Sequence, residues 1–498
     1  MLISEFLHNL TTQALEGLLK GEEIDIYEAP DFIIERPKNP NFGDFATSLP
    51  LQISKLLSKN PLDIAKNLVE LFPDCEEIEK LSVEKPGFIN FSLSKNWIKG
   101  EIKAIISNEK DYGRPSGPKD TKVQVEFVSV NPTGRLHLGH IRGAVIGSTI
   151  ANLLENQRFH VEREYYVNDA GNQMEIFGRS VVERIKEING MDFNISEDHY
   201  KGDDIVEIAR ELAAKYKNDD LKNTKDTVFD EIKNNSKDVC IKNIKEDLGL
   251  IKIEHDNWFY ESSLIDSNYF SNTLDNLSNL NLTYEKDGAI WVKTEELGDE
   301  RDNVLIKSND NKPTYFATDI AYHRDKFEVR NFDKVIDLWG ADHHGHIKRM
   351  ELILEELGID SRKLKVLLNQ IVSLKSSSGV SKFSKREGTS IFLKDLVEEI
   401  GSDACRFSFI NRSPESHMEI DIDIFKKQSS ENPVFYIQYA HARVSSILRS
   451  SEHFDIDYSD ANTNLLVSAD EVNLLKKLIE YPELLNRVTE TLNVHELA

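Results

Sequence analysis

Two histidines three positions apart, His137 and His140, follow an alternating apolar run in the stretch EFVSVNPTGRLHLGHIRGA. Imidazoles at positions i and i+3 of a helix project from the same side and can donate hydrogen bonds to phosphoryl oxygens. The first turn of a helix adds free N–H groups and partial positive charge, which favour phosphate, and Gly134 and Gly139 would let backbone approach a ligand closely. Two structural histidines remain the alternative, because this spacing alone is a weak signal.

A second histidine group lies in WGADHHGH, which contains Asp342, His343, His344 and His346. Imidazole and carboxylate ligate zinc and iron, so a metal cluster is one interpretation. Neighbouring His343 and His344 cannot both point the same way from regular structure. The favoured interpretation is therefore a second strand-end loop with Asp342 free to hydrogen-bond a ribose, and no tightly bound metal.

Two further groups of candidate binding residues contain lysines and carboxylates, respectively. The segment VSKFSKREGTS carries Lys382 and Lys385, which could close over a polyphosphate, although a solvated basic turn is the commoner fate of such a string. Glu261 lies in NWFYESSL, and Tyr315 and Asp319 are four apart, hence on one helical face. Carboxylates in apolar company can accept a guanidinium, whereas an Asp near a helix start is otherwise often a cap.

The surrounding pattern predicts the elements that position these groups. Residues 121–130 alternate and then run apolar, which predicts a strand; residues 140–157 read as a buried helix and 159–169 as a second strand. This β–loop–α–β order is typical of a parallel α/β sheet. Residues 333–358 repeat the scheme, and KLKVLLNQIVSL predicts one more strand.

The chain divides at a Gly- and Pro-rich linker, residues 111–120. We expect an α+β domain at 1–112, a parallel-sheet domain at 113–410 and an all-α domain at 411–498. Within the second domain, residues 179–255 are rich in Lys, Asp and Asn and are interpreted as a surface insertion.

Bulk properties bound the class of protein. At 498 residues the chain exceeds one compact core, and a net charge of −25 argues against loose coating of nucleic acid. Three widely spaced cysteines indicate a reducing compartment, and no apolar run approaches the roughly 20 residues that span a bilayer. We expect a cytoplasmic protein without membrane association.

In this order and spacing, the motifs resemble those of the class I aminoacyl-tRNA synthetases, and within that class the arginyl-tRNA synthetase family. HLGH resembles the HIGH signature of the class and KFSKR its KMSKS loop, with Phe383 in place of Met and Arg386 in place of the last Ser. Blocks similar to those of the arginyl family are EFVSVNPTGRLHLGHIRGA, YYVNDAGNQ, NWFYESSL, YFATDIAYH, WGADHHGH, NPVFYIQYAHAR, GDFAT and PGFIN. The resemblance covers nearly the whole chain and is weakest across residues 185–255.

The resemblance implies an α/β fold: a Rossmann-type parallel-sheet catalytic domain, with an N-terminal domain that contacts the tRNA elbow and a helical anticodon-binding domain. It implies catalytic roles for His137, His140, Lys382 and Lys385. The implied ATP site comprises Pro132, Thr133, Gly134, His137, Gly139, His140, Gly340, Asp342, His343, Lys382, Phe383, Ser384 and Lys385. The implied arginine site comprises Glu126, Asn131, Glu261, Tyr315 and Asp319. The implied tRNA contacts are Asn41, Phe42, Phe45, Tyr436, Tyr439 and Arg443.

The implied activity is ligation of L-arginine to its tRNA, with ATP, bound together with Mg²⁺, as the co-substrate. Proteins of this family are usually monomers. Because the family's helical domain normally continues beyond position 498, we expect that domain to be incomplete. Three alternatives stay open: a tRNA-binding relative without ligase activity, a small-molecule nucleotidyltransferase of the same fold, and a metal hydrolase.

Overall fold

The structure is a computed structural model that describes residues 2–22, 30–222, 226–309, 312–375, 391–453 and 461–498. The chain divides into two compact units, Met1–Ser116 with Arg449–Thr491, and Gly117–Leu448 with Leu492–Ala498. Residues 411–498, expected to form one helical domain, are therefore distributed over both units.

The first unit packs helices on a three-stranded antiparallel sheet of order β1-β3-β2. Its core includes Leu7 and Leu15, which lie on one face of the first helix, and Phe45 and Phe91 from the sheet. Its elements are α1 (Ile3–Gly21), η2 (Pro40–Phe42), β1 (Phe45–Thr47), α2 (Leu49–Leu57), α3 (Pro61–Leu71), β2 (Ile78–Glu84), β3 (Phe88–Leu93), α4 (Lys95–Asn108), η3 (Glu109–Asp111), η7 (Thr463–Leu465) and α18 (Ala469–Thr491).

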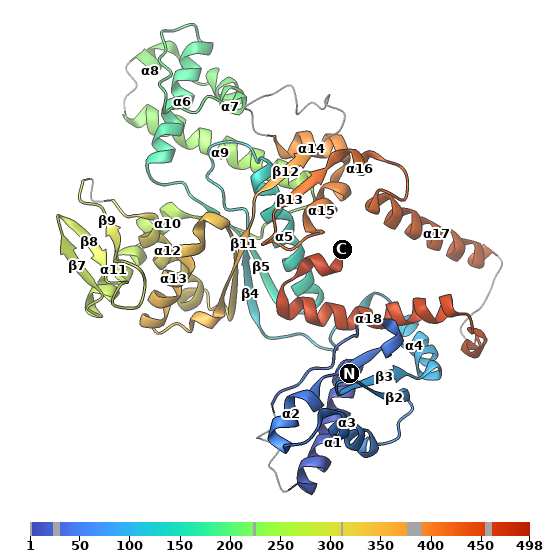
Figure 1. Ribbon diagram of the computed structural model, residues 1–498. Coiled ribbons are helices and arrows are strands. Elements are labelled where there is room, and N and C mark those ends of the chain that lie inside the picture. Colours follow the sequence, from blue (N-terminus) through green and yellow to red (C-terminus); the bar gives the residue numbers. More distant parts are fainter. Residues whose placement is uncertain (1, 23–29, 223–225, 310–311, 376–390, 454–460) are drawn as a thin grey trace. The chain divides into compact units, whose positions relative to one another are not determined.

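The second unit is built on a five-stranded parallel sheet of order β11-β10-β4-β5-β6 (Figure 1). The strands are β4 (Lys122–Glu126), β5 (His160–Val167), β6 (Asn257–Tyr260), β10 (Lys334–Gly340) and β11 (Leu364–Asn369). The first strand, β4, lies in the middle, and the chain proceeds outward to β6 on one side and later to β11 on the other. The order thus reverses between β4 and β10, where α/β sheets bind ligands outside the carboxyl ends of the strands.

Helix α5 (Leu138–Asn156) follows β4 and is buried on nearly every face. Gly147 allows this close packing, because a Cβ at that position would lie 2.3 Å from the ring of Phe127. The fixed backbone at the start of α5 carries the HLGH motif.

The strand predicted at 121–130 ends earlier, at Glu126. Val128 and Ser129 have φ angles of 73° and 42°, a left-handed conformation that is unfavourable for a β-branched residue and cannot continue a strand. The turn is held from β5: the Tyr165 hydroxyl donates to the Val130 carbonyl at 2.9 Å, and the Tyr166 N–H donates to the Ser129 hydroxyl at 3.0 Å. This turn directs residues 128–131 over the end of the sheet.

The insertion expected at residues 179–255 forms a helical lobe. It contains α6 (Asn172–Ile188), α7 (Asp203–Ala213), α8 (Asn218–Lys222) and α9 (Asp226–Leu250), which form the lobe at the top of Figure 1. Phe177, Ile208 and Ile232 contribute to its own apolar core. Dense surface charge concealed this apolar periodicity in the sequence.

KLKVLLNQIVSL, predicted as one strand, forms two. Its second half, β12 (Val372–Lys375), leaves the central sheet and pairs in parallel with β13 (Met418–Asp421). The remaining elements of this unit are α10 (Glu261–Asp266), α11 (Tyr269–Asn279), β7 (Thr283–Lys286), β8 (Ala289–Val292), β9 (Asn303–Ile306), α12 (Tyr315–Arg324), η4 (Asp325–Val329), η5 (Ala341–His343), α13 (His344–Glu356), η6 (Ser361–Lys363), α14 (Leu393–Ile400), α15 (Ser402–Ile410), α16 (Ile422–Lys426) and η8 (Val494–Leu497). Helix α17 (Pro433–His453) crosses the boundary between the units, and none of the helices among the described residues is long and apolar enough to span a bilayer.

Arg142 joins α5 to the β12–β13 region and gives a stability prediction. Its guanidinium is buried and donates to the carbonyls of Ser416 at 2.7 Å, Ser413 at 2.6 Å and Gln370 at 3.2 Å. Arg142→Leu should lower the free energy of unfolding by about 3 kcal/mol, because three partly buried carbonyls lose a charged donor. Denaturant titration measures this.

Arg362 provides the matched control. It is exposed and pairs with Asp360 at 2.8 Å, so Arg362→Leu should change stability by less than about 0.5 kcal/mol. Equal effects of the two substitutions would contradict the role assigned to Arg142.

Candidate active site

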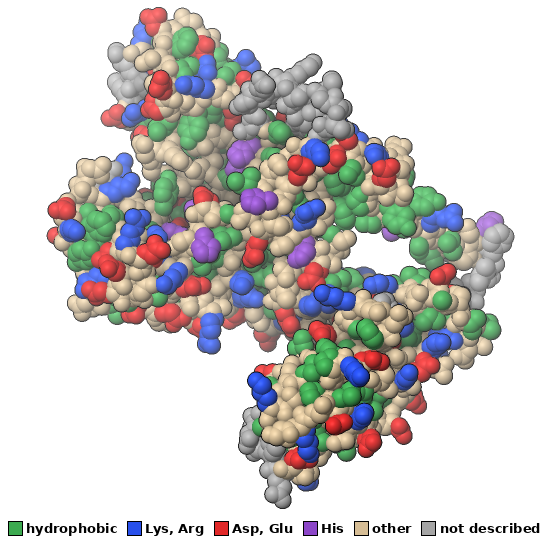
Figure 2. Space-filling view, viewed as in Figure 1, with side chains coloured by type: hydrophobic (Ala, Val, Ile, Leu, Met, Phe, Trp, Pro, Cys, Tyr) green, Lys and Arg blue, Asp and Glu red, His purple; other side chains and the backbone are tan. Residues whose placement is uncertain are grey.

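A cavity of about 540 Å³ lies outside the carboxyl ends of β4, β5, β10 and β11. It brings together residues that the sequence had singled out from three separate segments. Those that line it are Glu126, Asn131, Gly139, His140, Tyr315, Asp319, Gly340, Asp342 and His343. Figure 2 shows several histidine side chains gathered on one face of this unit.

The first end of the cavity is formed by the HLGH turn. His137 is the N-cap of α5, and its Nδ1 accepts a hydrogen bond from the Gly139 N–H at 3.2 Å. His140 Nδ1 accepts from the His137 N–H at 3.4 Å, and the two rings stack with centroids 3.6 Å apart. Burial lowers the pKa of both imidazoles, to about 3 for His140. Since both Nδ1 atoms accept, each neutral ring carries its proton on Nε2 as a donor.

Acidic side chains lie close together on and beside the cavity wall: Asp319 lines the cavity, whereas Glu261 does not line it and lies near Asp319 and Tyr166. Glu261 begins α10 and is buried; burial, assisted by the charge of Asp319, raises its pKa to about 7. Its Oε2 is buried and has no partner in hydrogen-bonding geometry among the described residues. An acceptor left in this condition fits a donor-rich ligand, because an unpaired buried polar group is costly.

Asp319 and Tyr315 share one face of α12, as their spacing predicted. The N-cap of that helix is Thr314, so the alternative that Asp319 is a capping residue is wrong. Asp319 Oδ2 lies 3.0 Å from His346 Nε2, and Tyr315 is half exposed on the cavity wall. The carboxylate is therefore held by a neighbouring imidazole while it faces the cavity.

Tyr166, at the end of β5, lies among three carboxylates. Burial and the charges of Glu261, Asp319 and Glu126 raise its pKa well above the ordinary value, so the side chain remains a phenol. The site thus presents carboxylate and phenol oxygens, an arrangement suited to a planar, multiply donating cation.

Two parts of the predicted ATP site differ from the cavity. Pro132, Thr133, Gly134 and His137 do not line it; before His137 the loop turns toward the helical lobe, where the Arg135 N–H donates to Asp204 at 3.3 Å. Lys382, Phe383, Ser384 and Lys385 lie outside the described residues. The chain that follows them, Ile391–Leu393, hydrogen-bonds to Leu136 and Leu138 beside the HLGH motif.

The predicted tRNA contacts also separate into two groups. Phe42 is exposed, as are Tyr436, Tyr439 and Arg443 on α17, whereas Phe45 is only 1% exposed. The ring of Phe45 is covered by the guanidinium of Arg36 at 4.3 Å, so a direct contact of Phe45 with RNA is wrong for this structure.

Several residues of the cavity were not selected from the sequence. Ser129 and Asn168 come from strand-end turns, Tyr166 from the end of β5 and Gln173 from the start of α6, where it accepts a hydrogen bond from the Asn131 amide. The others are Val128, Val130, Gly143, Tyr322, His323, Leu338, Trp339 and Asn369. A place at the end of a parallel strand is the signal that could have identified Ser129, Tyr166 and Asn168. Among the described residues there is no group of three or more side chains arranged to hold a metal.

The Rossmann strand order, the HxGH turn at the switch point and the acidic cavity define a class I aminoacyl-tRNA synthetase. Comparison with protein families agrees: the model "tRNA synthetases class I (R), catalytic domain" matches residues 101–419, "Arginyl tRNA synthetase N terminal domain" matches 5–93 and "DALR anticodon binding domain" matches 437–498. The chain belongs to the arginyl-tRNA synthetase family.

Individual relatives support this membership. An arginine–tRNA ligase of Dehalococcoides mccartyi is 42% identical over 98% of this chain and 87% of the relative. One of Caldanaerobacter subterraneus is 43% identical over 97% of this chain and 85% of the relative. The solved arginyl-tRNA synthetase of Thermus thermophilus is 19% identical and has the same fold, with a TM-score of 0.75 over 100% of this chain and 89% of that one. The segment expected to form the helical anticodon-binding domain is matched by that family model over residues 437–498.

Proposed function

We propose that the protein acts as an arginine–tRNA ligase, which forms arginyl-adenylate from L-arginine and ATP and transfers arginine to the 3′ end of its tRNA. One observation carries this proposal: in a chain of the arginyl family, a single cavity is lined at one end by the neutral imidazole of His140 and at the other by the Asp319 carboxylate, with buried Glu261 beside it. The first end suits the phosphates of ATP and the second suits a guanidinium.

The geometry supports a division of labour within the arginine site. Glu261, Asp319 and Tyr315 would hold the guanidinium. Glu126 and Asn131 adjoin the HLGH motif in the chain and line the same cavity, so they would take the α-ammonium group. The α-carboxylate is then directed toward the imidazoles, where the α-phosphate must lie.

Two displacements complete the reaction. A carboxylate oxygen of arginine attacks the α-phosphorus of ATP, a new P–O bond forms, and pyrophosphate leaves with the electrons of the broken bond. His137 and His140 would donate Nε2–H to the phosphoryl oxygens as negative charge builds up. The terminal ribose hydroxyl of tRNA then attacks the adenylate carbonyl and AMP leaves, so catalysis rests on positioning and electrostatics. Mg²⁺ would enter with ATP as part of the substrate complex.

The tRNA would be bound by surfaces at both ends of the chain. Asn41 and Phe42 on η2 would contact the elbow, and exposed Tyr436, Tyr439 and Arg443 on α17 would contact the anticodon arm. We further propose domains at 1–112, 113–410 and 411–498, and a cytoplasmic monomer as is usual for the family.

The decisive experiment is arginine-dependent exchange of pyrophosphate into ATP, with and without arginine-accepting tRNA. Exchange should occur with arginine but not with citrulline, which has the same shape without the charge, or with lysine, which leaves acceptors unpaired. A folded protein that shows no exchange when tRNA is present would overturn the proposal.

The raised pKa of Glu261, about 7, predicts that arginine binding depends on pH. Below this pH the free carboxyl is neutral, and binding a guanidinium must release its proton. The association constant should therefore rise with pH, by up to about tenfold per unit below pH 7, and level off above it. The charges facing Glu261 are Asp319 and Asp169, with the Tyr166 phenol, and Asp169 is already paired with Lys237 at 3.0 Å.

Isothermal titration with arginine at pH 5.5 to 8.5, in buffers of different ionisation enthalpy, measures both the affinity and the released proton. Glu261→Gln should bind more weakly and lose the proton release near pH 7. Unchanged proton release in this variant would assign the titration to another group.

A further inference from the structure

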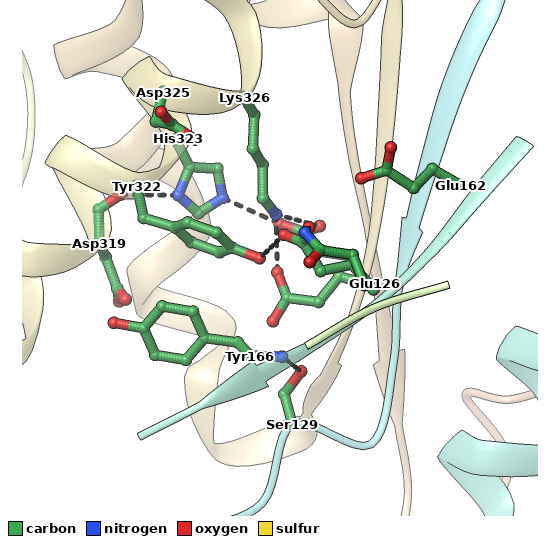
Figure 3. Close-up of polar contacts among 12 residues, drawn as sticks. Glu126, Ser129, Glu162, Tyr166, Asp319, Tyr322, His323, Asp325 and Lys326 are labelled. Carbon is green, nitrogen blue, oxygen red and sulfur yellow. Dashed lines mark hydrogen bonds and ion pairs between the residues drawn. The ribbon is translucent and has the colours of Figure 1, made fainter. Parts of the chain in front are cut away.

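A lysine that is completely buried, Lys326, lies beneath the cavity at the point where the strand order reverses (Figure 3). It follows α12 in a single turn of π-helix, Asp325–Val329, and its side chain extends toward Glu126 at the end of β4. Burying an ammonium group is costly unless it is paired, and π-helical turns frequently mark functional sites.

Lys326 Nζ binds two carboxylates, Glu126 Oε2 at 2.6 Å and Asp337 Oδ1 at 2.9 Å. Glu126 and Asp337 are direct partners in the parallel register of β4 and β10, so their side chains are brought together by the sheet itself. Two neighbouring buried carboxylates cannot both ionise without a cation between them.

His323 completes this group from the other side. Its Nδ1 lies 2.8 Å from the Asp319 carbonyl, which can only accept, and its Nε2 lies 2.8 Å from Asp337 Oδ2. Although burial opposes ionisation, Lys326 and His323 hold the pKa of Asp337 below its ordinary value. Asp337 is therefore a carboxylate, with one oxygen contacted by Lys326 and the other by His323.

The negative charge of Glu126 is less strongly stabilised than that of Asp337. Burial raises its pKa against the attraction of Lys326, and Lys326 is its one cationic partner among the described residues. The other charges around it belong to separate pairs: Glu164 on β5 binds Arg330 and the Tyr322 hydroxyl, and Arg330 also binds Asp325 at 2.7 Å.

Only one oxygen of Glu126 is used by this network. Oε2 binds Lys326, whereas no hydrogen bond from a described residue reaches Oε1, and Glu126 lines the cavity. Lys326 thus anchors the carboxylate from behind and leaves its second oxygen for a ligand.

We propose that Lys326 is a positioning residue for substrate binding: it keeps Glu126 ionised and oriented so that Oε1 accepts the α-ammonium group of the amino acid. The proposal rests on the function proposed above, because it assumes that the amino acid is arginine. Lys326 itself touches no substrate, and its effect reaches the ligand only through Glu126.

The test compares arginine with 5-guanidinopentanoate, which lacks only the α-amino group, as ligands that compete in arginine-dependent exchange. The wild-type protein should prefer arginine, and Lys326→Met and Glu126→Gln should each reduce this preference about tenfold or more. ATP affinity should be unchanged. Raising the pH should restore the preference in Lys326→Met, where Glu126 regains its charge, but not in Glu126→Gln.

Controls separate this role from a structural one. Lys99→Met removes another buried lysine, which lies in the first unit, and should leave the preference intact. Adding Lys326→Met to Glu126→Gln should cause no further loss of preference, and this neutral pair also serves if Lys326→Met alone does not fold. A further loss in the double variant, or a folded Lys326→Met with full preference, would overturn the inference. Absence of exchange in the wild type would instead reject the proposed function.

Discussion

Asp319→Ala is expected to raise the KM for arginine by about 100-fold to 1,000-fold while the KM for ATP changes less than about threefold. A carboxylate that binds a guanidinium contributes about 3–4 kcal/mol, because its loss leaves the ligand's donors unpaired. ATP is expected at the other end of the cavity and does not contact this carboxylate. Steady-state pyrophosphate exchange at varied arginine and ATP measures both constants.

The control for Asp319 is its neighbour His346, which lies 3.0 Å from Oδ2. His346→Asn keeps a donor for the carboxylate and should raise the arginine KM by only about tenfold or less. An equal rise of both KM values in Asp319→Ala would show that the residue supports the whole cavity rather than the guanidinium.

His140→Ala is expected to lower the kcat of pyrophosphate exchange by about 100-fold to 1,000-fold, the usual cost of one lost donor to a developing oxyanion. The affinity for arginine should persist, because His140 lies at the phosphate end of the cavity. The tautomer derived above makes Nε2–H the donor, and a pKa of about 3 keeps this ring neutral throughout the working range. The activity should therefore show no inflection near pH 6.5 from this residue.

His344→Ala is the matched control for His140. His344 is exposed at the start of α13 and does not line the cavity, so its loss should leave kcat within about twofold. If His140→Ala abolishes tRNA binding instead of kcat, the histidine has a structural role. If it leaves kcat intact, the phosphate role is wrong.

Much of the site could be predicted because its motifs are local. The HLGH turn, the Tyr315–Asp319 spacing and the second strand-end loop are each set by a few adjacent residues, and the structure places them around one cavity. The predicted end of the first strand was wrong, because residues distant in the sequence determine the backbone conformation there. Val128 and Val130 continued the apolar run, but hydrogen bonds from Tyr165 and Tyr166 stabilise a left-handed turn there.

Residue type alone did not predict which side chains are buried: a residue expected at the surface for binding and a lysine are both in the interior. Phe45 lies in the GDFAT motif of the N-terminal family domain, yet its ring lies in the core under Arg36. Lys326 gave no signal at all, because lysine is almost never fully buried and its surroundings read as an ordinary helix. Both outcomes depend on which elements pack together.

The sequence by itself determined the class of fold, the order of the motifs and the chemistry of the residues available, because periodicity and turn residues act over short distances. Only the tertiary structure decided the ionisation states and side-chain orientations of those residues. Glu126 and Lys326 are 200 positions apart in the chain, and the sheet register that sets Glu126 beside Asp337 exists only once β4 and β10 have paired. Ionisation in a buried site depends on such neighbours, so the charge that Glu126 presents to a substrate is a property of the folded molecule.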